Sequence, residues 1–204
     1  MGLRERKKEK TRLAILDAAL DLFLEQGYDA TTVEQIAGAA EVSPRTFFRY
    51  FSGKEHLALW YHDYGEAVMR EALDSRPADE PPFTSLLHAL RAVADDIQEL
   101  TPEDAERFLK MRKVYEANPT LIGKAVGRAA ETELRLVDAV ARRTGLDPDE
   151  SRLPYLVVAF AMSITRVGFE CPRPEVTGVS DLAARLRETV DLAERVFVPG
   201  WDRP

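Results

Sequence analysis

The chain has 204 residues, of which 45% are hydrophobic and 31% charged, and its formal net charge at pH 7 is −7. This composition predicts a soluble globular protein that buries roughly 70% of its unfolded surface, and it excludes a low-complexity or repeat protein. The single cysteine, Cys171, excludes an intrachain disulfide and, with a charged N-terminus that lacks the apolar core of a secretory signal, predicts a cytoplasmic protein.

The N-terminus is basic although the whole chain is acidic. Residues 1–12 hold six basic and two acidic side chains, a net +4, whereas residues 13–56 carry −4 and residues 57–204 carry −7. Attraction to DNA phosphates acts within about a Debye length, roughly 8 Å at physiological salt. The positive charge of residues 1–12 therefore matters more for DNA binding than the net charge of the whole chain. Residues 1–10 are either an arm that contacts DNA phosphates or the minor groove, or a disordered, solvated terminus.

A strong amphipathic helix is predicted from Thr11 to Gln26. Gly27 can take a positive φ and end this helix. Its apolar side chains fall at helical spacing on one side: Ile15, Leu16, Ala19, Leu20, Leu22 and Phe23.

The stretch from Thr31 to Lys54 predicts two short helices joined by a tight turn. Thr31 or Thr32 can cap the first helix, with a capping-box partner at Glu34 or Gln35. Helices this short are not stable alone, so they must pack against the preceding helix. The second helix is predicted to open with Ser43 as its cap and Pro44 at its first position.

The second of these helices has two different faces. Phe47 and Phe51 share the face that we expect to pack on the helix at 11–26, and Arg45 and Arg49 point nearly the opposite way. Arginine matches the acceptors of guanine in the major groove, and Thr46 or Phe48 can meet a thymine methyl. Tyr50 and Lys54 follow and can hold phosphates. The alternative is that the two arginines form a merely solvated helix face.

Residues 11–57 closely resemble the N-terminal DNA-binding domain of the TetR family of transcriptional regulators. The matching residues are Ile15, Ala18, Ala19, Phe23, Gly27, Thr31 to Val33, Ile36, Ala37, Val42, Ser43, Thr46, Phe48, Phe51, Lys54 and Glu55. Glu41 departs from the family pattern, which commonly has glycine in this turn, and Tyr50 stands where many members carry histidine. The predicted DNA-binding residues are Thr31, Thr32, Ser43, Pro44, Arg45, Thr46, Phe48, Arg49, Tyr50 and Lys54.

The rest of the chain predicts further helices and no sheet. We expect an all-α fold of about nine helices, with a helix-turn-helix domain at residues 1–56 and a ligand-binding and dimerisation domain at residues 57–204. The apolar segment 155–169 is shorter than the roughly 20 residues that span a bilayer, so we expect a buried helix there. The later helices are predicted at residues 54–74, 83–99, 101–115, 118–143, 147–170 and 180–196.

The layout of the C-terminal domain is also similar to that of TetR-family members thought to sense acyl-CoA-like molecules. The resemblance implies an apolar pocket for a small effector, although each of its candidate residues could equally be ordinary core. The pocket candidates are Phe108, Met111, Tyr115, Leu121, Ile122, Val126, Tyr155, Phe160, Met162, Phe169, Arg166 and Arg112. We expect the last two long helices to form a homodimer, with interface candidates Leu182, Leu186, Val190 and Val196.

Other chemistry has little support in the sequence. His56, His62 and His88 are not spaced as metal ligands or catalytic bases, and the nucleotide-binding and hydrolase motifs are absent. We therefore expect no catalytic residue, metal or cofactor, and no membrane partner. The predicted protein is a ligand-responsive regulator, most simply a repressor, that binds a pseudo-palindromic operator as a homodimer. A helical enzyme and a protein-interaction module are the alternatives.

Overall fold

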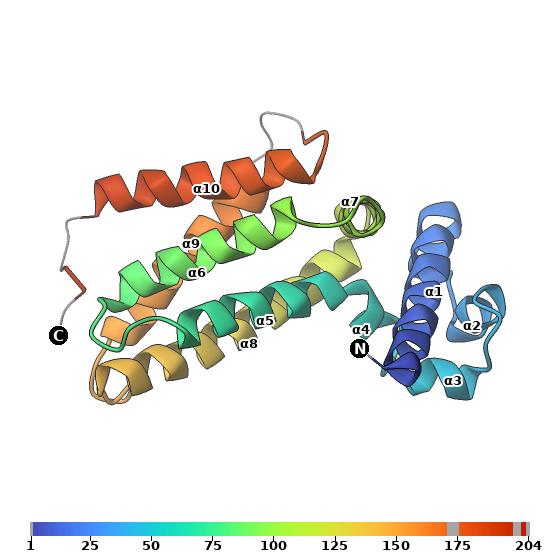
Figure 1. Ribbon diagram of the computed structural model, residues 1–204, viewed down its shortest axis with the longest axis horizontal. Coiled ribbons are helices and arrows are strands. Elements are labelled where there is room, and N and C mark those ends of the chain that lie inside the picture. Colours follow the sequence, from blue (N-terminus) through green and yellow to red (C-terminus); the bar gives the residue numbers. More distant parts are fainter. Residues whose placement is uncertain (1, 171–175, 198–200, 203–204) are drawn as a thin grey trace. The chain divides into compact units, whose positions relative to one another are not determined.

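The computed structural model describes residues 2–170, 176–197 and 201–202, and all regular structure within them is helical (Figure 1). The all-α prediction is confirmed, and Cys171 lies outside the described residues. The described residues form α1 (Leu3–Gln26), α2 (Val33–Ala39), α3 (Pro44–Phe48), α4 (Lys54–Ala58), α5 (Trp60–Asp74), α6 (Pro82–Gln98), α7 (Pro102–Glu116), α8 (Pro119–Thr144), α9 (Leu153–Glu170) and α10 (Val179–Val196).

The helices group into two compact units. The first unit comprises Met1–Asp63 together with Pro102–Ala125, and the second comprises Tyr64–Thr101 together with Val126–Pro204. The first unit therefore contains α7, which comes from the middle of the sequence, beside α1 to α4. These units are defined by packing. The predicted boundary after residue 56 separates a DNA-binding domain from a ligand-binding and dimerisation domain, and it stays a prediction.

The core of the first unit explains how two short helices become stable. Phe47 and Phe51 are buried against α1, as predicted, with no more than 2% of either side chain exposed. Burial of this apolar surface supplies the stabilisation that helices of five to seven residues lack on their own. The same buried cluster contains Ile15, Leu16, Ala19, Leu20, Phe23, Tyr28, Ile36, Ala37, Leu57, Ala58, Met111, Val114 and Leu121.

The predicted helix caps are also present. The Thr32 hydroxyl accepts from the backbone N–H of Gln35, and the Gln35 side chain accepts from the backbone N–H of Thr32, which completes a capping box. Ser43 caps α3 by accepting from the Thr46 N–H at 3.1 Å, with Pro44 at the first helical position. Gly27 ends α1 with a φ of 88°.

The N-terminal segment differs from the prediction. Residues 3–10 are helical and continue into α1, so the arm that we expected to be irregular is the first part of a 24-residue helix. Arginine, lysine and glutamate are strong helix formers, and this propensity outweighs the repulsion among the basic groups. The Glu5 carboxylate accepts from the Gly2 N–H at 2.9 Å and satisfies a free donor at the helix start.

Two other helix boundaries differ from the predicted ones. The predicted helix at 54–74 is divided at Leu59 into α4 and α5, although no glycine or proline marks the break. The helix predicted from residue 147 begins only at Leu153. The Asp147 carboxylate accepts from the Asp149 N–H at 2.9 Å and holds a turn, and the Ser151 hydroxyl then accepts from the Leu153 N–H.

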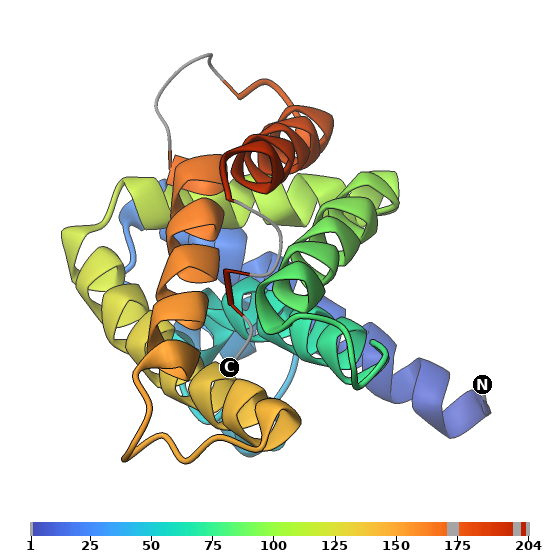
Figure 2. The ribbon, with the colours of Figure 1, turned by 90° about the vertical axis from the view of Figure 1, so that its left-hand side faces the viewer.

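In the second unit, α10 packs against α6 and α9 (Figures 1 and 2). Leu182, Leu186 and Val190 have no exposed surface, so these three were wrong as dimer-interface candidates. The helical stripe in the sequence correctly identified a buried face, but its partner is the same chain. Gly168 of α9 permits the close approach, because a Cβ there would lie 3.0 Å from the Leu186 side chain.

The C-terminal end of the second unit covers the start of α6. Phe83, Phe160, Phe197 and Trp201 form an aromatic cluster with ring centroids 4.7–6.4 Å apart. The Asp202 carboxylate, 2% exposed as a residue, accepts from the backbone N–H of Phe83 at 2.7 Å. Asp202 therefore supplies the side-chain cap that prolines at the start of α6 do not provide.

One helix among the described residues, α9, is long and apolar enough to cross a membrane by length and composition alone. From the sequence, we expected segment 155–169 to be too short for that. The helix extends to 18 residues, and its apolar side pairs with α6 and α10 within the second unit.

Candidate nucleic-acid interface

The outer face of α3 carries the side chains that the sequence predicted for base contacts. Arg45, Phe48 and Arg49 are all exposed, and 56% of Phe48 is open to solvent. The Phe48 ring meets the buried Phe47 ring edge-on, at a centroid distance of 5.4 Å. A large exposed aromatic ring between two guanidinium groups is costly in water and suits an apolar contact with a base edge.

The flanking polar residues hold the ends of this face in place. The Arg49 guanidinium lies over the Tyr50 ring at 5.0 Å and its Nη2 lies 3.4 Å from the Tyr50 hydroxyl. The Ser43 and Thr46 hydroxyls are 2.9 Å apart and hydrogen-bonded. Thr32, Ser43 and Pro44 are exposed at the first turns of α2 and α3, so their positions are compatible with phosphate contacts.

The turn between α2 and α3 contains Glu41 with a φ of 53°, the left-handed region that glycine normally occupies. The Val42 N–H donates to the Ala37 carbonyl at 2.9 Å and closes the turn around it. The family departure at Glu41 therefore has a physical consequence, because a side chain sits where the backbone favours none.

Two predicted DNA contacts have another role in the structure. Thr31 is 1% exposed, and its hydroxyl donates to the Gly27 carbonyl at 2.8 Å. The Lys54 ammonium donates to the carbonyls of Tyr28, Asp29 and Thr31 at 2.8, 3.2 and 3.0 Å, and it lies over the Tyr28 ring. These three hydrogen bonds match the three protons of the ammonium group, and through them Lys54 joins the 28–31 loop to the start of α4.

Basic side chains at the start of α1 extend the positive surface of the first unit. Arg4, Arg6, Lys7, Lys8 and Lys10 are exposed along one continuous helix. Their helical order fixes the spacing of these charges, which a disordered arm would not. Ordered cations close to a DNA-reading helix strengthen binding to any sequence by releasing counterions.

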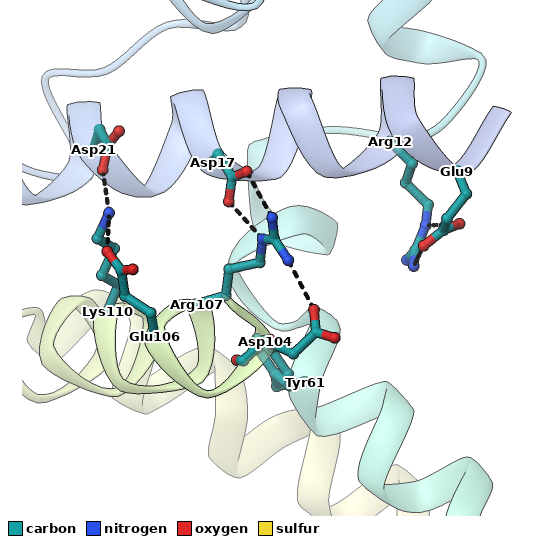
Figure 3. Close-up of polar contacts among 9 residues, drawn as sticks. All are labelled: Glu9, Arg12, Asp17, Asp21, Tyr61, Asp104, Glu106, Arg107 and Lys110. Carbon is teal, nitrogen blue, oxygen red and sulfur yellow. Dashed lines mark hydrogen bonds and ion pairs between the residues drawn. The ribbon is translucent and has the colours of Figure 1, made fainter. Parts of the chain in front are cut away.

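The packing of α7 on α1, shown in Figure 3, was not predicted from the sequence. The Arg107 guanidinium forms a bidentate pair with Asp17, at 2.6 and 3.0 Å, and the Lys110 ammonium lies 2.9 Å from Asp21. The hydrogen bonds that Arg107 donates to the Asp17 carboxylate raise the pKa of Arg107. The spacing of the charges is the one signal of this contact in the sequence. The two acids are four residues apart and share one face of α1, and the two bases are three residues apart and share one face of α7.

Neighbouring groups complete this region. The Tyr61 hydroxyl donates to the Asp104 carbonyl at 3.0 Å, and burial raises the pKa of Tyr61. The Arg12 guanidinium lies 4.4 Å above the Trp60 ring, and its hydrogen bond lowers the pKa of Glu9. These contacts tie α5 to both α1 and α7.

The predicted effector-binding residues are divided between the two units. Phe108 meets the Tyr61 ring, Met111 is buried in the core of the first unit, Tyr115 packs on that core, and Ile122 is 38% exposed. In the second unit, Phe160 belongs to the aromatic cluster and Met162 is half-buried. The exposed members of the set in the second unit are Val126, Tyr155 and Arg166.

A concave surface of about 380 Å³ lies at the ends of α5 and α8, and none of the predicted effector residues lines it. Its walls are largely polar and include Asp74, Arg76, Arg142 and Arg143. Within the described ranges, no group of three or more His, Cys, Asp or Glu residues is placed to hold a metal ion.

Comparison with known proteins gives the context for this geometry. Residues 15–59 match the family described as "Bacterial regulatory proteins, tetR family", and residues 84–198 match the "MftR C-terminal domain". The chain is similar to the HTH-type transcriptional regulator TcmR of Streptomyces glaucescens, at 37% identity over all of this chain and 91% of TcmR. It is 36% identical to the regulator RutR of Escherichia coli, over 98% of this chain and 94% of RutR.

The fold also matches solved structures. The structure described as "SmeT-Triclosan complex" aligns with a TM-score of 0.53 and 19% identity, covering 96% of this chain and 98% of that one. At this identity the match establishes a common helical fold.

Proposed function

Because the chain belongs to the TetR family of bacterial transcriptional regulators, we propose that it is a ligand-responsive repressor that binds a pseudo-palindromic DNA operator as a homodimer. The observation that carries this proposal is the outer face of α3, where Arg45, Phe48 and Arg49 are exposed on a helix buried from behind. A small apolar effector releases the protein from DNA. Its place of action is the cytoplasm, where the operator DNA is found.

The test of this proposal is the base preference of Arg45. Arg45→Ala should cost about 1–3 kcal/mol in operator affinity and relax the preference at one or two base pairs, because a bidentate contact to guanine is lost. The measurement is binding of wild type and variant to an operator selected from random DNA by the wild-type protein, and to its single-base variants. Unchanged affinity and unchanged base preference would show that α3 does not read the groove.

The homodimer follows from the size of the reading surface. One recognition helix covers too few base pairs for useful specificity, and two copies one turn of DNA apart, about 34 Å, double it. Exposed apolar side chains on the last two long helices support them as the contact surface. These are Leu156, Val167, Leu192 and Val196, 46–66% exposed.

Effector release requires a dimer state in which the two α3 helices are no longer one DNA turn apart. The ligand must bind this state more tightly than it binds the operator-bound dimer. A typical coupling of about 1–3 kcal/mol gives a 5–150-fold change in affinity, and DNA must weaken ligand binding by the same factor. Acyl-CoAs and free fatty acids are our first candidates, from the layout of the C-terminal helices. Titrating them against the protein–operator complex tests this, and a ligand that binds equally well with and without operator argues against the mechanism.

The alternatives are a helical enzyme and a protein-interaction module without a DNA role. The relatives at 36–37% identity are named transcriptional regulators, which favours the regulator. Sequence-specific DNA binding by the wild-type protein would remove both alternatives as the main function.

A further inference from the structure

The contact between α1 and α7 is ionic at its edge and apolar beneath. Asp17 and Asp21 of α1 pair with Arg107 and Lys110 of α7, at 2.6 and 2.9 Å for the shortest contacts. The two acids are four residues apart, so the pairs are spaced about 6 Å along the α1 axis. Figure 3 shows both pairs on the same side of α1.

The Arg107 pair is built to fix an angle. Only 15% of the Arg107 side chain is exposed, and its guanidinium contacts both oxygens of Asp17 and, at 2.8 Å, one oxygen of Asp104. Asp104 lies on the same helix as Arg107 and holds its guanidinium in place, and the two hydrogen bonds from this guanidinium to Asp17 restrict rotation of α7 against α1. Met111 and Val114 of α7 are buried in the cluster that also contains the apolar side chains of α1.

The recognition helix depends on the orientation of α1. Phe47 and Phe51 are buried in one cluster with the apolar side chains of α1, and α2 contacts both α1 and α3, so we expect a tilt of α1 to move α3 with it. α7, in turn, follows α6 in the chain after residues 99–101 and leads into α8. Both α6 and most of α8 belong to the second unit, so α7 is covalently joined to that unit at each end.

We propose that the ion pairs Asp17–Arg107 and Asp21–Lys110 are positioning contacts that determine which half-site spacing the dimer accepts. This inference rests on the proposed function and deepens it, because it assigns operator specificity to residues that touch no DNA. By fixing α1 against α7, the pairs restrict the directions in which α3 can point. A protein without them should still bind each half-site but tolerate a wrong distance between the two.

The experiment measures affinity for operators that differ only in spacer length. The operator selected by the wild-type protein is compared with versions one or two base pairs shorter and longer. In Asp17→Asn and in Arg107→Gln, the preference for the best spacer should fall about 5-fold or more, the lower end of typical coupling. The double variant should be no worse than either single variant, because both remove the same contact. Arg107→Lys should retain part of the preference.

Two control variants separate positioning from stability and from base reading. Arg91→Gln breaks a similar ion pair between α6 and α10, where Arg91 contacts Asp191 and Glu194, and should leave the spacer preference unchanged. Arg45→Ala should lower affinity at all spacers alike. The preference is a ratio within one sample, so an unfolded fraction cancels.

The outcomes distinguish the two levels of the proposal. If the wild-type protein selects no operator, the proposed function fails. If it selects one and the spacer preference of Asp17→Asn and Arg107→Gln matches wild type within about 2-fold, the positioning role is wrong. A loss equal to that of Arg91→Gln would also overturn it, because the effect would then not be specific to the contact between α1 and α7.

Discussion

Glu41 carries a side chain at a φ of 53°, where the Cβ atom crowds the backbone. Glu41→Gly should therefore stabilise the protein by about 0.5–1 kcal/mol, since relief of roughly 1–2 kcal/mol of strain is offset by the greater freedom of glycine in the unfolded chain. Urea denaturation measures the change. Glu41→Ala is the control, because it removes the charge and keeps the strain. If alanine stabilises as much as glycine, the charge and not the backbone is responsible.

Lys54 is predicted to act in folding and not in DNA contact. Lys54→Met keeps the aliphatic stem and removes the ammonium, leaving three carbonyls without their donor, which should cost about 1–3 kcal/mol of stability. The dependence of DNA affinity on salt should stay unchanged. Loss of a true phosphate contact would instead reduce the slope of log affinity against log salt by about 1. A reduced slope in a fully folded variant would return Lys54 to the DNA interface.

At the scale of the elements, we expect the segment that precedes α6 to contribute a stability that depends on pH. Arg76 donates a bidentate pair to Glu80, Ser85 donates to it at 2.7 Å, and these bonds lower the pKa of Glu80 to about 2. A depressed folded-state pKa contributes stability above the ordinary value near 4.5, and this stability is lost as the pH falls toward 2.

Glu80→Gln should consequently destabilise the protein by about 1 kcal/mol at pH 6, a value discounted for solvent screening, and by progressively less below pH 4. Urea denaturation of both proteins at pH 6 and at pH 3 gives the comparison. An equal difference at the two values would mean that packing, and not ionisation, makes the contribution.

Local patterns were predictable from sequence, and non-local partners were not. The Thr32 and Ser43 caps depend on residues three positions apart, so the sequence contains all the information that they need. The apolar spacing on α10 led us to place Leu186 in a dimer interface, because periodicity cannot say whether the surface that covers it belongs to the same chain. The pairing of Arg107 with Asp17 joins residues 90 positions apart, and no local rule predicts it.

The predicted DNA-binding residues also include some that local pattern could place and some that it could not. The exposed set Arg45, Phe48 and Arg49 follows from helical phase on a short helix with one buried side. For Thr31 and Lys54 the structure shows polar groups bonded to backbone carbonyls of residues 27–31, partners that the sequence does not reveal, and their predicted DNA contacts stay predictions.

For the whole molecule, the homodimer can be tested at the surface of α10. Leu192→Glu with Val196→Glu places charges on side chains that are 53% and 66% exposed in the single chain. We expect a monomeric mass at micromolar concentration and protection of a single half-site in footprinting, since burying unpaired charges opposes association. Leu24→Glu, at a 43% exposed position on α1, is the control and should remain dimeric. A dimer in both variants would place the interface elsewhere.

The inclusion of α7 in the first unit has a consequence for synthesis on the ribosome. Helices α1 to α4 emerge first, but Met111, Val114 and Leu121, which complete their core, lie beyond residue 101. At about 5–20 residues per second, the roughly 60 residues between Asp63 and Ala125 take about 3–12 s to make. During that interval part of the apolar surface of α1 is uncovered and available to chaperones. The core of the first unit is therefore completed late in synthesis, although helices α1 to α4 are made first.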